Sequence, residues 1–228
     1  MTLADVMAQE RGALMTEYLF PEGIPGVSGG INVPPYAAIP NFDVLKSTPR
    51  FLRARHPLQI FEVSGARRGH AYVQSCPSLG YNFLWTHVDN DNYRPDYVLF
   101  LQQQYGMSVT ALPETHHVDH LFNRERARAR RLPYVRMVLL PRGVNTSHGA
   151  GYEKSRTRGG IGAEGVQRGI DEIMLLKLWG ILTPRQGVPL SPEIQAHVIH
   201  MAAVFGLPAA EVERNIRELM EVASFRPA

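Results

Sequence analysis

Side chains able to bind a metal or move a proton gather in one stretch, Thr115–His120, and in a second cluster, Asn145–His148. The first contains three histidines and Asp119, and the second offers an amide and an imidazole. Carboxylate and amide oxygens suit a hard cation such as Mg²⁺. A neutral imidazole beside that cation can take a proton from water near neutral pH. These groups indicate a divalent-metal site that cleaves phosphodiesters, where the metal stabilises the developing negative charge.

Two antiparallel strands, over residues 110–121 and 134–140, are expected to carry this site. An arginine-rich segment joins them, and a helical or looped segment follows. Neighbouring side chains on a strand point to opposite faces. Asp119 and His120 are therefore expected to converge on one site only at a strand end or a bulge.

An Asp119-His120 pair at a strand end, a second strand and then Asn145 entering a short helix resembles the ββα-metal (HNH-type) endonuclease superfamily. The resemblance covers about residues 112–158 and implies a nuclease that acts on DNA or RNA. It implies that Asp119 binds Mg²⁺, with Zn²⁺ or Mn²⁺ as alternatives, and that His120 activates the attacking water. It also implies that Asn145 or His148 completes the metal site.

Further residues extend this resemblance and also limit it. Glu153 falls where some members keep a carboxylate that holds metal-bound water, and the His116-His117 pair is similar to the paired histidines of bacterial toxin members. Asn123 stands too close to the Asp-His pair to be the usual middle Asn. Either Asn145 takes that place with His148 as the ligand, or Asn145 is itself the ligand.

A run of arginines follows directly after the proposed general base. On a helix, Arg124, Arg128 and Arg131 would share a face. Each guanidinium group can contact phosphate without reading sequence. The alternative is a solvated, charge-rich helix or loop. The residues expected to contact nucleic acid are Arg124, Arg126, Arg128, Arg131, Lys154 and Arg156.

Two rival functions remain open from the sequence. A zinc hydrolase would use His116, His120 and His148, although no zinc-enzyme spacing such as HExxH is present. A non-catalytic nucleic-acid-binding or assembly protein would use the arginine run and the C-terminal helices. The second alternative predicts salt-sensitive binding that is indifferent to EDTA.

Composition is that of an ordinary soluble globular protein, with 44% hydrophobic and 20% charged residues, a formal charge of +3 and one cysteine. The first residues include Asp5 and Glu10 and predict no signal peptide, and no apolar run is long enough to span a membrane. The protein is therefore expected to stay in the cytoplasm or to be exported by a dedicated machine. The resemblance to bacterial toxin members implies that the protein acts as an antibacterial toxin or effector. Such a toxin would have a cognate immunity protein as its partner.

The pattern of apolar residues predicts an α+β fold in two parts. Residues 1–165 are expected to form an α+β domain with a small antiparallel sheet, and residues 166–228 a helical subdomain packed on it. Within the first part we expect a helix over 2–20, a hairpin over 58–63 and 71–74, strands over 81–85 and 107–112, and a helix over 94–105. Helices are also expected over 171–182, from 191 to 206 and after 208.

Overall fold

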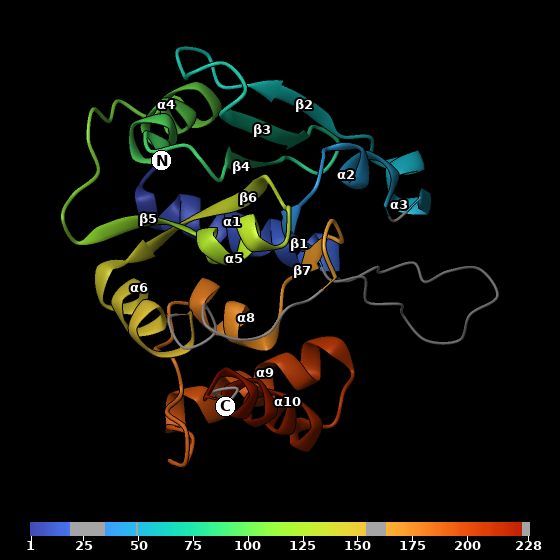
Figure 1. Cartoon of the computed structure of the whole chain (residues 1–228), viewed down its shortest axis with the longest axis vertical. Coiled ribbons are helices and arrows are strands. Elements are labelled where there is room, and N and C mark those ends of the chain that lie inside the picture. Colours follow the sequence, from blue (N-terminus) through green and yellow to red (C-terminus); the bar gives the residue numbers. More distant parts are fainter. Residues whose placement is uncertain (19–34, 49, 154–162, 225–228) are drawn as a thin grey trace.

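Strand β6 (Tyr134–Pro141) is the central strand of an antiparallel sheet. Its six inner residues are all buried, as expected for a strand covered on both faces. The first half of β6 pairs with β4 and β1, and its second half pairs with β5. The computed structural model describes residues 1–18, 35–48, 50–153 and 163–224, and Figure 1 shows how these elements are arranged.

The strand order along the sheet is β2-β3-β4-β6-β1-β7, with β5 paired to β6 away from this path. The strands are β1 (Tyr36–Ile39), β2 (Gln59–Glu62), β3 (Ala71–Cys76), β4 (Tyr81–His87), β5 (His116–His120) and β7 (Arg168–Gly169). The β2–β3 hairpin and β4 confirm the strands expected over 58–63, 71–74 and 81–85. The strand expected over 107–112 is wrong, because the chain pairs with β6 only from His116 onward.

Helices cover the sheet and form the C-terminal part. They are α1 (Leu3–Tyr18), α2 (Asp43–Ser47), α3 (Arg50–Arg55), α4 (Tyr93–Tyr105), α5 (Arg124–Ala129), α6 (Arg142–His148), the π-helical turn η1 (Gly149–Glu153), α8 (Glu172–Leu178), α9 (Pro192–Phe205) and α10 (Ala209–Ser224). Helix α4 ends at Gly106 and α9 at Gly206, both in the left-handed conformation that glycine adopts without strain. The α+β class with a helical C-terminal part is confirmed.

Two cores lie on opposite faces of β6, and its side chains alternate between them. Met137 and Leu139 pack with α4 and the first turns of α1, whereas Val138 and Leu140 pack with α8, α9 and α10. The second core is one contiguous cluster, whose members range from Leu14 in α1 to Met220 in α10. The helices after residue 166 therefore share one apolar core with the sheet. Figure 1 shows α8 between the sheet and the α9–α10 pair.

Within the described residues, no helix combines the length and the apolar character needed to cross a membrane.

Candidate active site

Strand β5 sends its side chains alternately to the two sides of the sheet. Val118 packs into the core formed with α4, so His116 and His120 share that side. His117 and Asp119 face the other side, where α6 and α8 lie. The pairing of β5 with β6 is regular from His116 to His120 and contains no bulge. The expected convergence of Asp119 and His120 on one site is therefore wrong.

His120 is a buried side chain and does not reach solvent. Only 6% of it is exposed, and its ring stands edge-on to Tyr93 of α4, with ring centroids 4.8 Å apart. Burial lowers the pKa of His120 to about 4, with Asp119 opposing the shift. Its Nε2 atom lacks a hydrogen-bond partner among the described residues. A neutral imidazole enclosed in this way is poorly placed to activate a water molecule.

Asp119 is held by a buried ammonium group from α8. The Nζ atom of Lys177 donates to Asp119 Oδ2 at 2.6 Å and to the backbone carbonyl oxygen of His120 at 3.3 Å, and it also contacts Glu153. The Lys177 side chain is 1% exposed. Burial disfavours its charge, but Asp119 and Glu153 outweigh that effect and raise the pKa of Lys177. We call these three residues the lysine triad.

Turn η1 brings Glu153 to this triad. The segment can pass close to Thr183 because residue 151 is glycine: a Cβ atom there would lie 2.7 Å from Thr183 Cγ2. His148, at the end of α6, is 1% exposed, and its Nε2 atom lies 2.9 Å from the carbonyl oxygen of Ile181. Burial lowers the pKa of His148 to about 4. His148 thus bonds the backbone next to α8 rather than an open site.

These contacts oppose the expected divalent-metal site, because an ammonium group already engages its carboxylate, Asp119. The charge that a cation would offer to Asp119 and Glu153 is already supplied by Lys177. In the described part of the chain, no group of three or more His, Cys, Asp or Glu side chains is placed to hold a metal ion. The zinc alternative fails because His116 and His120 lie on the α4 side of β5 and His148 on the other.

Because Lys177 occupies both carboxylates, divalent ions should not stabilise this protein. We expect millimolar Mg²⁺, Mn²⁺ or Zn²⁺, or EDTA, to shift the melting temperature by less than about 1 °C, since only a ligand that binds the folded state raises it. Thermal unfolding followed by circular dichroism measures this. A rise with Mg²⁺ that disappears in Asp119→Asn would contradict the account.

His117 is the histidine of this stretch that meets a polar partner on α6. Its Nδ1 atom lies 3.1 Å from the side-chain amide of Asn145. Burial lowers the pKa of His117, and the nearby guanidinium groups of Arg94 and Arg142 lower it further, against the opposing effect of Asp119. The ring is partly exposed and, with this pKa, neutral near pH 7. It can therefore accept a proton there.

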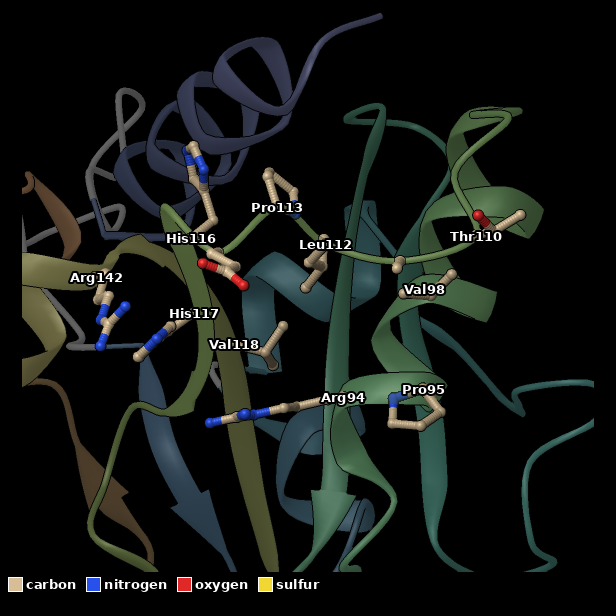
Figure 2. Close-up of a pocket in the computed structure, with 12 residues that line it drawn as sticks. Arg94, Pro95, Val98, Thr110, Leu112, Pro113, His116, His117, Val118 and Arg142 are labelled. Atoms are coloured by element: carbon tan, nitrogen blue, oxygen red, sulfur yellow. The ribbon is translucent and has the colours of Figure 1, made fainter.

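Two arginines stand beside His117 at the edge of a pocket of about 500 Å³ (Figure 2). Arg94 comes from the first turn of α4, and Arg142 begins α6, where its backbone N–H donates to the carbonyl oxygen of Thr115 at 2.9 Å. Both are exposed, and neither side chain has a hydrogen bond or ion pair with the described residues. Two guanidinium groups that have no ion pair within the described part of the chain favour an anion at this place.

The arginines of the run after β5 are engaged within the protein, unlike Arg94 and Arg142. Arg124 donates to Asp91 at 2.9 Å, and Arg128 donates to Asp89 at 2.8 Å and also contacts Glu125. Arg126 is buried over the ring of Phe122, and Arg131, beyond the end of α5, pairs with Glu164 at 3.1 Å. These contacts oppose the expected phosphate-binding face; Lys154 and Arg156 lie outside the described residues.

The sequence patterns missed Arg94 and Lys177. Both lie far from the histidine cluster in the chain, and Lys177 sits inside an apolar helical pattern where a single lysine gives no sign of a partner. The signal available for Lys177 was its position in that otherwise buried stretch, because a buried lysine needs a carboxylate nearby.

Comparisons with family models, with curated proteins and with solved structures found no match to this chain.

Proposed function

We propose that this protein is a nuclease that hydrolyses phosphodiester bonds at the pocket between α4, β5 and α6. The observation that carries the proposal is His117, which Asn145 holds in place between Arg94 and Arg142, two arginines without an ion pair among the described residues. The chain order β5, α5, β6, α6 also supports the proposal, because two paired strands precede a helix as in the ββα arrangement, although α5 is inserted between the strands. In this proposal the general base is the imidazole of His117 rather than that of His120, and no step uses a metal.

The contact with Asn145 sets which nitrogen of His117 can act. The atom of Asn145 that faces Nδ1 is its amide nitrogen, at 3.1 Å, and the amide oxygen takes this place when the amide group flips. In the flipped orientation the oxygen accepts from Nδ1–H, so the Nε2 atom carries no proton and is free to take one. A water molecule placed between Nε2 and the phosphorus atom would then lose its proton to His117 as its oxygen attacks. The P–O bond to the leaving oxygen breaks, and that oxygen takes a proton from solvent.

Arg94 and Arg142 supply positive charge where the attack adds negative charge. Both can donate to non-bridging phosphate oxygens, and both hold His117 in its neutral form before the reaction. The positive end of α4 adds to the same potential, because Arg94 lies in its first turn. The arrangement thus combines a proton acceptor with preorganised charge stabilisation.

Removing both charges should abolish most of the activity. We expect Arg94→Met/Arg142→Met to lower the cleavage rate of a labelled oligonucleotide at least about 100-fold, since one lost stabilising donor already costs on that order. The matched control is Arg67→Met/Arg68→Met, which removes two exposed arginines at the β2–β3 turn. Absence of cleavage by the wild-type protein, or equal loss in both double variants, would refute the proposal.

A further inference from the structure

The pocket beside His117 is larger than a phosphate group requires, and its two ends differ in character. Figure 2 shows the Arg94 guanidinium reaching toward His117 and Arg142, while Pro95, Val98 and Leu112 lie to the other side. The volume of about 500 Å³ falls within the range of sites that enclose a small molecule. One end therefore suits an anion and the other suits an apolar, flat group.

The apolar end is built by residues that the chain holds in fixed places. Val98 lies one turn after Arg94 on α4 and is 9% exposed. Opposite it, the segment after Gly106 is tied back to α4, since Gln102 Nε2 donates to the carbonyl oxygen of Val109 at 2.5 Å. Leu112 in this segment packs against the core under β5. The cavity is thus bounded by one helix and one anchored segment.

Two further polar groups line the pocket and can read the edge of a ligand. Thr110 and Glu114 line the same pocket, so a hydroxyl group and a carboxylate are available for hydrogen bonds. A nucleobase combines an apolar face with donors and acceptors on its edge, and it is joined to a phosphate through a sugar. No other part of a nucleic acid combines these features.

We propose that this pocket takes a single unpaired nucleotide, with its phosphate at Arg94, Arg142 and His117 and its base against Val98 and Leu112. The inference rests on the proposed function and names its substrate class: single-stranded nucleic acid. In a duplex the base would first have to leave the stack and lose its pairing, whereas a base in an unpaired strand does not meet this cost.

Binding measured on a cleavage-deficient protein tests this separately from catalysis. With His117→Ala, fluorescence anisotropy should show a labelled single-stranded oligonucleotide bound at least tenfold more tightly than the same sequence as a blunt duplex. By competition, a 5′-mononucleotide should bind at least tenfold more tightly than inorganic phosphate. Leu112→Ser should remove most of the mononucleotide advantage, whereas Leu182→Ser, a control at an exposed leucine outside the pocket, should keep it.

Each result decides one of the two claims. Tenfold preferences without any cleavage by the wild-type protein would support the nucleotide pocket and refute the nuclease. Cleavage with equal affinity for single strand and duplex, or for mononucleotide and phosphate, would refute the pocket and keep the nuclease. A single strand bound no better than the mononucleotide would also overturn the inference, because the site would then serve free nucleotides. Loss of the preference in Leu182→Ser as well as Leu112→Ser would count against the assigned pocket.

Discussion

Replacing Lys177 with methionine should destabilise the protein by about 3–5 kcal/mol, which is the usual cost of leaving a buried charge without its partner. The ammonium is 1% exposed and is the shared partner of Asp119 and Glu153. Without it, two carboxylates face each other in a largely buried space. For a chain of this length the loss corresponds to a fall in melting temperature of roughly 6–20 °C.

Lys46→Met is the matched control for this variant. Lys46 also meets an aspartate, Asp43, at 4.0 Å, but the lysine is 52% exposed, so its loss should cost less than about 1 kcal/mol. Urea unfolding of both variants gives the comparison. A loss in Lys177→Met no larger than in Lys46→Met would mean that the lysine triad does not stabilise the fold.

The pH dependence of Lys177→Met has a definite sign. Burial raises the pKa of Glu153 and Lys177 opposes this shift, so without the ammonium the pKa should rise further and ionisation of this carboxyl group should oppose folding at neutral pH. That cost disappears as the pH falls toward the unfolded pKa values, because both states are then protonated. The difference in stability between variant and wild type should therefore shrink from pH 7 to pH 4.

Replacing His117 with alanine should lower the cleavage rate about 10²–10⁴-fold, the range expected for loss of a general base. The residue is partly exposed, so the protein should remain folded. His200→Ala, at an exposed histidine on α9, is the control and should leave the rate unchanged. His120→Leu should change stability but keep cleavage per folded molecule within about threefold, because His120 is buried against Tyr93 and does not line the pocket. Full activity of His117→Ala would exclude it as the base.

Local patterns predicted much of this fold because they reflect short-range physical effects. The alternating residues and turn glycines of β2 and β3 predicted the hairpin, and Ser191 predicted the start of α9, where its hydroxyl accepts the N–H of Ile194. The extent of β5 was less predictable. Residues 107–115 have strand-like composition, but the β6 partner is available only from His116.

The site could be predicted only in part, because its decisive contacts are distant in sequence. Asp119 and Lys177 are 58 residues apart, and no local pattern indicates that an ammonium meets this carboxylate. Strand alternation already implied that the side chains of Asp119 and His120 point to opposite faces. The regular pairing of β5 with β6 keeps them on opposite faces. The same alternation places His117 on the side of Asp119 and toward Asn145, so the relevant histidine lies three positions before His120, which the pattern favoured as the base.

The pH dependence of cleavage in Asn145→Asp tests most directly whether His117 is the general base. A carboxylate in place of the amide would face Nδ1–H and raise the pKa of His117, which burial lowers in the wild type. The account predicts that the acid limb of the kcat/KM profile moves to higher pH by the same amount as the His117 titration observed by NMR. An acid limb that stays in place while the His117 titration moves would show that another group takes the proton.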